Sequence, residues 1–433
     1  MTATSESASG HAGAAGLDRL YRRVSRRLLP FLFLCYVAAY LDRVNVGFAK
    51  LQMQADLALS DTVYGIGAGI FFIGYFLFEV PSNLLMERVG ARRWIARIMI
   101  SWGVVSVATM FATGPASFYA LRFLLGVAEA GFFPGVVLYL TYWYPAQRRA
   151  RIVALFMSGV AVAGVVGGPL SGAIMAGLAG QAGLHGWQWL FLLEGLPSIA
   201  LGVWTLFWLD DNIRAARWLD DAAKAALEAA LAPEAAAKQH LPLSRLFASG
   251  TVWLLALVYF LCVMGLYGVS FWLPQLLKNS GVEDVFDIGL LTAIPYGVAA
   301  IAMVLAARHS DRSGERRWHT AIAAFAGAAG LTIATAYAHD TVLALAALSL
   351  ATAGILSTFP IFWSLPTALL GGTAAAAGIA LVNSVGNLAG FVSPYLVGAI
   401  RDATGSTAIG ILVLSASLVL GGLLVLVVAR RVP

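Results

Sequence analysis

The sequence predicts an all-α membrane protein in which twelve transmembrane helices form two six-helix halves. Three observations support this fold class. The 433 residues are 60% hydrophobic and only 12% charged, whereas soluble domains carry about 25% charged residues. Apolar runs of about 20 residues, the length that crosses a bilayer, recur along the whole chain. Two sequence markers also repeat at a nearly constant offset between the halves.

The apolar runs predict the position of each spanning helix. They cover approximately residues 28–49, 62–85, 93–113, 116–140, 150–175, 188–209, 251–277, 286–307, 318–338, 341–366, 373–399 and 406–428. The resulting parts are a cytoplasmic N-terminal segment (1–27), a first half (28–209), a cytoplasmic linker (210–250), a second half (251–428) and a cytoplasmic tail (429–433). The polar linker is expected to form short amphipathic helices that join the halves.

The distribution of arginine and lysine predicts the orientation. Basic residues concentrate in the N-terminal segment, in the loops after the second, fourth and eighth spans, in the linker and in the tail. The loops 113–116, 180–187 and 338–341 have almost none. Because basic loops stay in the cytoplasm, both termini are expected to be cytoplasmic. The expected location is the bacterial inner membrane.

A repeated loop motif indicates that the halves are copies of one unit. The pattern acid-Arg-x-Gly-x-Arg follows the second span as Glu87, Arg88, Gly90 and Arg92, and the eighth as Asp311, Arg312, Gly314 and Arg316. The two copies are 224 residues apart, and Pro169 and Pro394 are 225 apart. The glycine allows a tight turn, and the acid can cap a helix or pair with arginine. We interpret the motif as a cytoplasmic gating latch; topogenic charge alone is the alternative.

Four charged residues lie deep inside apolar runs: Asp42, Arg43, Arg122 and Glu129. Each costs roughly 2.5–3.5 kcal/mol at the middle of a bilayer, so such residues face a protein interior and mark substrate or proton paths. Arg122 and Glu129 share one helix face about 10.5 Å apart, and the adjacent Asp42 and Arg43 point about 100° apart. We expect all four to face one central cavity. The alternative is that the four residues form two ion pairs that only hold helices together.

Composition also limits the kinds of function. Cys35 and Cys262 lie in different apolar runs, and the six histidines fall in loops or at helix ends. No metal site, cofactor or histidine proton relay is therefore expected. There is no phosphate loop, no nucleophile-base set and no nucleic-acid-binding module, which argues against an enzyme, a pump or a nucleic-acid partner. The expected partners are the lipid bilayer, protons and a small organic anion, and the chain is expected to be a monomer.

At these residues the chain resembles the major facilitator superfamily and, within it, the anion:cation symporter family. The resemblance covers all twelve spans and is most specific at 40–45 (YLDRVN), 74–83 (GYFLFEVPSN), 122–130 (RFLLGVAEA) with Phe133 and Pro134, and 191–197 (FLLEGLP). It implies the major facilitator fold and the transport of organic anions such as galactonate, tartrate, phthalate or hydroxyphenylacetate, commonly with protons. In galactonate-type members, the positions of Asp42, Arg43, Arg122 and Glu129 form the coupling and substrate site.

The resemblance also assigns three uncharged residues. Tyr75 and Asn383 match a pocket tyrosine of the second span and a pocket asparagine of the eleventh. Tyr259 stands where such members can have glutamine in the seventh span, which favours a less hydroxylated or aromatic anion over a sugar acid. Counting about 225 residues on from Asp42 reaches the uncharged Tyr267. Ionic coupling is therefore expected in the first half, with hydrogen bonds and stacking from the second.

These assignments predict a proton-coupled importer of a small organic carboxylate. Arg43 and Arg122 would bind the carboxylate, because the planar guanidinium offers two parallel hydrogen bonds. Asp42 and Glu129 would carry the proton, while Glu79 and Glu194 are assigned structural or gating roles. The alternatives are efflux or exchange of an organic anion and a sensor that binds without transport. The sequence names neither the carboxylate nor the proton stoichiometry.

Overall fold

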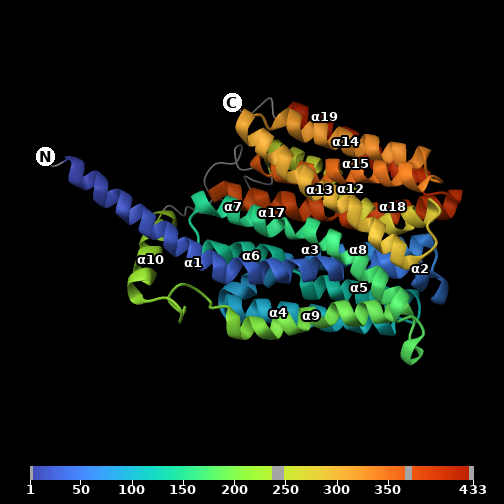
Figure 1. Cartoon of the computed structure of the whole chain (residues 1–433), viewed down its shortest axis with the longest axis horizontal. Coiled ribbons are helices and arrows are strands. Elements are labelled where there is room, and N and C mark those ends of the chain that lie inside the picture. Colours follow the sequence, from blue (N-terminus) through green and yellow to red (C-terminus); the bar gives the residue numbers. More distant parts are fainter. Residues whose placement is uncertain (1–2, 237–247, 366–372, 429–433) are drawn as a thin grey trace.

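The computed structural model describes residues 3–236, 248–365 and 373–428, and the regular elements of this part are all helical (Figure 1). In chain order they are α1 (Ala3–Val44), α2 (Val46–Asp56), α3 (Asp61–Val89), α4 (Ala91–Ala108), η1 (Thr109–Phe111), α5 (Pro115–Glu129), α6 (Phe132–Thr141), α7 (Ala146–Met157), α8 (Gly159–Gly177), η2 (Gln181–Gly183), α9 (Gly186–Trp208), α10 (Asp221–Ala236), α12 (Gly250–Asn279), α13 (Val285–Ser313), α14 (Arg317–Ala336), α15 (Thr341–Phe362), α17 (Thr373–Asn387), α18 (Ala389–Thr404) and α19 (Ala408–Val428).

The described part of the chain contains twelve segments that are long and apolar enough to cross a membrane. They coincide with the twelve predicted spans, so the predicted fold class is confirmed. Several spans consist of two consecutive helices separated by a break: α1 and α2, α5 and α6, α7 and α8, and α17 and α18. The first span, Gly16–Asp56, extends past the predicted apolar run at both ends, since polar residues continue the helix on either side.

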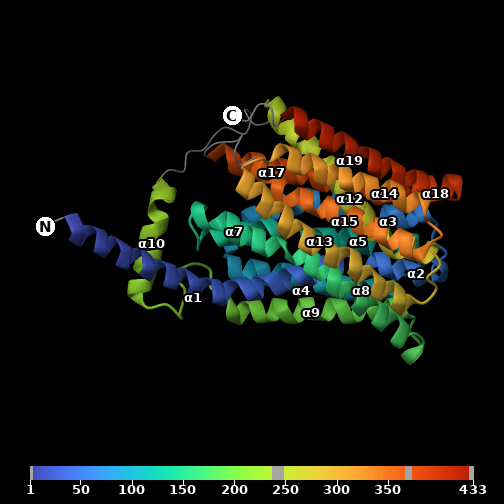
Figure 2. The ribbon, with the colours of Figure 1, turned by 45° about the horizontal axis from the view of Figure 1, so that its top comes forward.

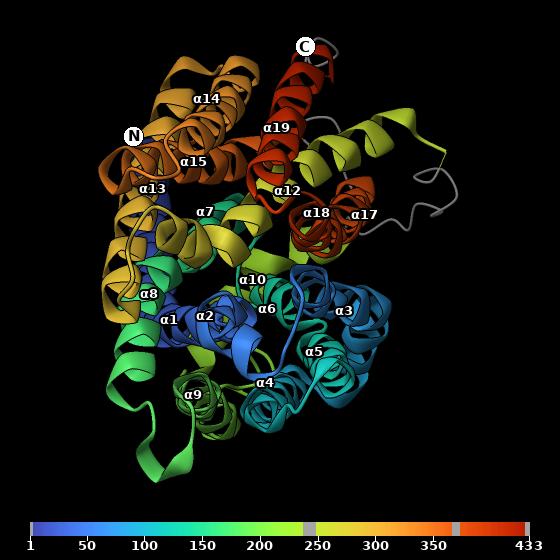
Figure 3. The ribbon, with the colours of Figure 1, turned by 90° about the vertical axis from the view of Figure 1, so that its right-hand side faces the viewer.

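Two of the helix pairs that join the first half of the chain to the second depend on glycine. In one seam α8 packs against α13, and in the other α3 packs against α18 (Figures 2 and 3). An added Cβ on Gly289 would lie 2.4 Å from the carbonyl oxygen of Gly168, and one on Gly65 would lie 2.4 Å from that of Pro394. A side chain at either position would therefore push the helices apart, which is why small residues enrich such membrane interfaces.

The two seams follow the sequence repeat. Gly65 and Gly289 are 224 residues apart, the same offset that separates the two loop motifs. Their contact partners lie in α18 and α8, which contain the second pair of markers, Pro394 and Pro169. The symmetry of the internal repeat therefore relates one seam to the other, as expected for parallel repeats about an axis along the membrane normal.

A cluster of charges closes the end of the bundle that lies away from both termini, here called the distal end (Figure 1). Lys50 Nζ lies 2.7 Å from Asp61 Oδ1, and Arg401 Nε lies 3.2 Å from Asp61 Oδ2. The Asp402 carboxylate accepts hydrogen bonds from the backbone N–H groups of Asp61 and Thr62 at 3.1 and 2.7 Å. Because α3 and α18 belong to different halves, these contacts hold the halves together at this end.

The loop motifs lie at the other end of the bundle. Gly90 and Gly314 both have positive φ, of 95° and 69°, which is the tight turn that the motif predicted. In the second copy, Arg316 Nη1 donates to Asp311 Oδ1 at 2.5 Å. In the first copy, Glu87, Arg88 and Arg92 do not form the equivalent pair. Glu87 is exposed, and the backbone N–H of Arg92 instead donates to Asp211 Oδ1 at 2.9 Å.

Asp211 and Glu315 therefore cap helices at this end, and the sequence analysis assigned a cap to neither. Asp211 comes from the start of the linker and caps α4. Glu315 lies inside the second loop motif and accepts backbone hydrogen bonds from Trp318 and His319 at 2.7 and 3.2 Å. Partial burial opposes the charge of Glu315, but the hydrogen bonds from Trp318 and His319 outweigh it and lower the pKa of this carboxyl.

The first prediction concerns the glycine seam. Gly289→Ala places a Cβ against the backbone of α8, so we expect loss of monodisperse folded protein or a clearly lower unfolding temperature. Gly297→Ala is the matched control on the same helix, because nothing lies within 4 Å of a Cβ at that position. Alanine favours a helix over glycine by roughly 0.5–1 kcal/mol, so the control should be at least as stable as the original protein. Equal unfolding temperatures for the two variants would contradict the close approach.

The second prediction concerns the distal charges. Asp61→Asn removes the carboxylate that Lys50 and Arg401 share, and the two buried or half-buried cations then repel each other. We expect faster hydrogen exchange in the first turn of α3 and the last turn of α18. Asp287→Asn, at an exposed position at the start of α13, is the control and should leave both segments protected. Unchanged exchange in Asp61→Asn would show that the glycine seam alone closes this end.

Candidate functional site

Two helix breaks place charged residues in the middle of the bundle. Arg43 lies in the last turn of α1, and Glu129 is the last residue of α5. After Glu129 the chain leaves the helix at Ala130, and Gly131 adopts a φ of 85°, which a residue with a Cβ would rarely adopt. An added Cβ on Gly131 would also lie 2.4 Å from Ser82 Oγ. Non-helical backbone at membrane depth is tolerated only inside protein, so the breaks lie where the site is built.

Arg43 and Glu129 form a buried ion pair that reaches the second half of the chain. Arg43 Nη2 donates to Glu129 Oε1, and Arg43 Nη1 donates to the hydroxyl of Tyr267 on α12 at 3.1 Å. The Glu129 side chain is fully buried and that of Arg43 is 10% exposed. The second oxygen of Glu129 has no hydrogen-bond partner among the described residues. The pair can therefore accept a further proton or donor without losing its present contact.

Arg122 lies next to this pair but binds backbone. Its Nη2 donates to the carbonyl oxygen of Arg43 at 3.1 Å and to that of Ala68 at 3.4 Å, and its Nε donates to that of Gly67 at 3.4 Å. The side chain is fully buried, and its Nη1 has no partner among the described residues. Arg122 thus supplies donors to carbonyls at the end of α1 and within α3, and has one donor left.

Asp42 points away from the other three charges. It accepts hydrogen bonds from Trp102 Nε1 at 3.0 Å and Ser106 Oγ at 2.7 Å, both on α4, and from Ser198 Oγ of α9 at 2.5 Å. The carboxylate is fully buried, and no ion pair joins it to a cation in the described part of the chain. The expected separation of Asp42 and Arg43 around the helix is present. Asp42 therefore lies inside the first half, behind the cluster of Arg43, Arg122 and Glu129.

The uncharged residues that the resemblance assigned lie around this cluster at different distances. The Tyr75 ring lies 5.4 Å from the guanidinium carbon of Arg43. Asn383 Nδ2 donates to Glu79 Oε1 of the first half at 3.4 Å. Tyr259 packs in an aromatic group with Phe359, Phe362 and Trp363, with ring centroids 4.8–5.8 Å away. The structure thus brings Tyr75 to the ion pair, while Asn383 contacts Glu79 and Tyr259 belongs to an apolar wall.

Sequence reasoning did not assign the hydroxyl groups around Asp42 or the cluster at Lys50. Isolated serines in apolar helices commonly bond to their own backbone, so Ser106 and Ser198 gave no separate signal. Lys50 did give a signal in the sequence, because it is a charge that directly follows the first apolar run. It is fully buried, pairs with Asp61, and lies 3.6 Å from the centroid of the Trp272 ring. Trp272 is therefore part of the distal closure, not of the cluster around Arg43.

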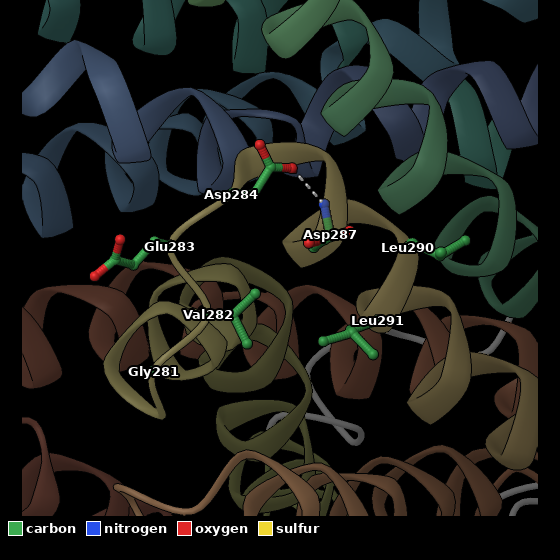
Figure 4. Close-up of a pocket in the computed structure, with 7 residues that line it drawn as sticks. All are labelled: Gly281, Val282, Glu283, Asp284, Asp287, Leu290 and Leu291. Carbon is green, nitrogen blue, oxygen red and sulfur yellow. Dashed lines mark hydrogen bonds between the residues drawn. The ribbon is translucent and has the colours of Figure 1, made fainter.

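A hollow of about 560 Å³ lies elsewhere, on the surface loop between α12 and α13 (Figure 4). Glu283, Asp284 and Asp287 line it, and Asp284 Oδ1 accepts a hydrogen bond from the backbone N–H of Asp287 at 3.0 Å. Three exposed carboxylates would repel an anion. This hollow is therefore a poor candidate for the binding of an organic acid.

The fold and the buried cluster agree with the comparisons to known proteins. The sequence matches the profile of the Major Facilitator Superfamily over residues 32–394. The chain belongs to this superfamily of transporters. It is 50% identical over 418 residues to a candidate tartrate transporter of Agrobacterium vitis, covering 96% of each chain. It is 42% identical over 413 residues to a quinolone resistance transporter of Acinetobacter baumannii, covering 95% of each.

A solved structure supports the fold alone. The crystal structure of a D-xylose-proton symporter superposes with a TM-score of 0.73 at 16% identity, covering 94% of this chain and 98% of the other. The profile match and the relative with 50% identity confirm the family resemblance inferred from the sequence motifs, and the protein is a multi-pass membrane transporter of the major facilitator superfamily.

A comparison of a single and a double variant tests the buried ion pair. Arg43→Gln leaves Glu129 buried without its cation, and breaking a buried pair from one side costs about 3–5 kcal/mol. The double variant Arg43→Gln with Glu129→Gln removes the orphaned charge, so its unfolding temperature in detergent should exceed that of the single variant. A double variant no more stable than Arg43→Gln would show that the two side chains are not energetically coupled.

Proposed function

We propose that this transporter couples protons to the uptake of a small organic carboxylate by alternating access in the bacterial inner membrane, with both termini in the cytoplasm. The observation that carries the proposal is the buried pair of Arg43 and Glu129, which touches the other half through Tyr267. The pair holds a carboxylate on an arginine in the middle of a transporter fold. A substrate carboxylate can take the place of that carboxylate once Glu129 is protonated.

The proposed coupling is a competition for one guanidinium. While ionised, Glu129 occupies Arg43 and keeps an organic anion away. A proton on Glu129 weakens this contact, because the neutral acid no longer attracts the cation. Arg43 then binds the substrate with two parallel hydrogen bonds, and the remaining donor of Arg122 can assist it. Substrate and proton thus bind together and leave together, which is symport.

Asp42 is the second proposed proton carrier. Its three donors come from α4 and α9, so its charge state acts on the packing of the first half and does not touch the substrate directly. A buried carboxylate without a cation is costly to ionise. The two serine hydroxyl groups can also accept a hydrogen bond, so the same three residues can bind either form of the acid.

The proposed movement is a rocking of the two halves about the cluster. The seams of α8 with α13 and α3 with α18, together with the cluster of Lys50, Asp61, Arg401 and Asp402, close the distal end in the present state. With the proposed orientation this is the periplasmic end. Import would then require these contacts to open for loading and to close before release into the cytoplasm.

The walls near the cluster favour a small acid with apolar or aromatic character. Tyr75 lies beside Arg43, and Tyr259 belongs to an aromatic wall with Phe362 and Trp363. Tartrate is the first probe, because a relative with 50% identity is named for it. A thermal-shift screen over organic acids, aromatic acids included, would rank the others, since a ligand that binds the folded state raises its stability.

Efflux or exchange of an organic anion is the second candidate. The relative from Acinetobacter baumannii, which is named a quinolone resistance transporter, favours it. The same ion pair serves both directions, because the imposed gradients set the direction of a coupled carrier. Uptake and efflux assays in oriented vesicles would separate the two candidates.

The decisive experiment removes the proposed coupling acid. Glu129→Gln mimics the protonated state, so Arg43 stays free for substrate. In proteoliposomes with an imposed pH gradient, we expect tartrate exchange to persist while uphill accumulation falls at least about tenfold, the equivalent of about 1.4 kcal/mol. Glu283→Gln, at an exposed loop position, is the control and should accumulate normally. Wild-type accumulation by Glu129→Gln would remove Glu129 from the coupling mechanism.

A further inference from the structure

Glu79 is a buried carboxylate at the contact between the two halves, and the proposed cycle so far gives it no role. It lies on α3 one helical turn beyond Tyr75 and is 4% exposed. Its Oε2 accepts a hydrogen bond from Ser384 Oγ at 3.0 Å, and its Oε1 accepts one from Asn383 Nδ2 at 3.4 Å. Both partners are on α17, so the two hydrogen bonds cross from the first half to the second.

The other buried carboxylates of the spans have different surroundings. Glu129 is paired with Arg43, and Asp42 is held by α4 and α9 of its own half. Glu194 accepts a hydrogen bond from Ser171 of α8, also in its own half. Among these four buried carboxylates, Glu79 is the one in which two features occur together. Its own hydrogen bonds join the halves, and no ion pair links it to a cation.

Ionisation of Glu79 therefore acts directly on the contact between α3 and α17. An ionised carboxylate held away from water without a cation costs several kcal/mol, and two neutral donors repay only part of this. A protonated carboxyl costs much less. It can also donate its proton to the hydroxyl oxygen of Ser384 or the amide oxygen of Asn383. The closed contact thus favours the protonated acid, and the open, hydrated contact favours the ionised acid.

We propose that Glu79 is a third proton-carrying residue of the transport cycle, whose protonation holds α3 and α17 together and whose deprotonation lets them separate. This inference rests on the proposed function and extends it. Glu79 lies between the cluster of Arg43 and the end of α3 that carries the first loop motif. In an importer with the proposed orientation, that is the side on which the proton leaves, so proton release and opening toward the cytoplasm become one event.

The neighbouring ionisable groups leave Glu79 free to act in this way. The groups whose charge acts on Glu79 are Arg43 of α1 and Tyr75 of α3. Other ionisable groups on the elements that contact α3 include Arg97 of α4, Arg122 and Glu129 of α5, Tyr139 of α6 and, at the far end of α18, Arg401 and Asp402. Arg43 is the cation that acts on Glu79, and it is already paired with Glu129. Protonation of Glu129 would strengthen the pull of Arg43 on Glu79, which links the two acids.

Asn383 has a different place in this scheme from the one that the family resemblance gave it. In the present state its Nδ2 donates to Glu79, so a substrate that uses this donor must displace that carboxylate. Substrate binding and the closed contact therefore compete for the same amide.

The test measures opening without any substrate. Spin labels on Val89→Cys, at the end of α3, and Arg308→Cys, near the end of α13, report the distance between the halves by pulsed electron resonance in lipid nanodiscs. Both positions are exposed, and the native Cys35 and Cys262 are buried. Measurements at about pH 5 and about pH 9 bracket the range in which buried carboxyl groups titrate. We expect the labelled pair to shift toward longer distances at the higher pH.

Three further variants decide the assignment. Glu79→Gln should lose the shift and keep the short distance at both pH values, because glutamine mimics the protonated acid. Ser384→Ala should raise the long-distance population at about pH 5, because the contact loses a partner. Glu194→Gln, a buried carboxylate bound within one half, should keep the full shift. A shift that persists in Glu79→Gln, or its absence from the parent pair, would overturn the inference. No substrate or gradient is present, so failure here leaves the Glu129 uptake test unaffected, and the reverse also holds.

Discussion

The structure depends on a constraint that the bilayer imposes: a charge in the membrane must be neutralised within the protein. Arg43 and Glu129 meet this constraint together, and Arg122 meets it by donating to the carbonyl of Arg43 at the end of α1 and to a carbonyl within α3. At the break between α1 and α2, Arg122 donates to a carbonyl at the end of the interrupted helix. The charges thus permit non-helical backbone in the middle of the bundle, and the breaks in turn bring α1, α5 and α12 together at one place.

The contact between the halves depends on close approach of backbones at glycines. Glycine at Gly65, Gly168 and Gly289 lets backbones touch along two seams, so little side-chain volume separates the halves. Contacts of this kind are short and rigid, and they can open as a unit because few side chains interlock across them. Polar contacts then decide which end is closed. Asp61 with two cations acts at the distal end, and Glu79 with two neutral donors acts on the other side of the central cluster.

Acidic residues of nearly equal burial therefore have different chemical roles. Glu129 has a cation and competes with the substrate for it. Asp42 has three donors within its own half, and Glu79 has two donors in the other half. A carboxylate that gains or loses a proton changes what its neighbours can do, so each acid acts on a different part of the proposed cycle. Local hydropathy does not distinguish these acids from one another. Their hydrogen-bond and ion-pair partners do.

The sequence by itself determined the fold class, the twelve spans and the family, because hydropathy and loop motifs are local properties that each segment carries alone. It also singled out Asp42, Arg43, Arg122 and Glu129 as charges that must gather inside the protein, and their position at one central cavity stays a prediction. The tertiary structure decided which partner each charge has. Asp42 turned toward hydroxyl groups of α4 and α9, and Asn383 toward Glu79, because side chains far apart in the chain meet only when helices pack. The gating role of the loop motifs stays a prediction. In the first copy, the cap of α4 comes from Asp211 of the linker.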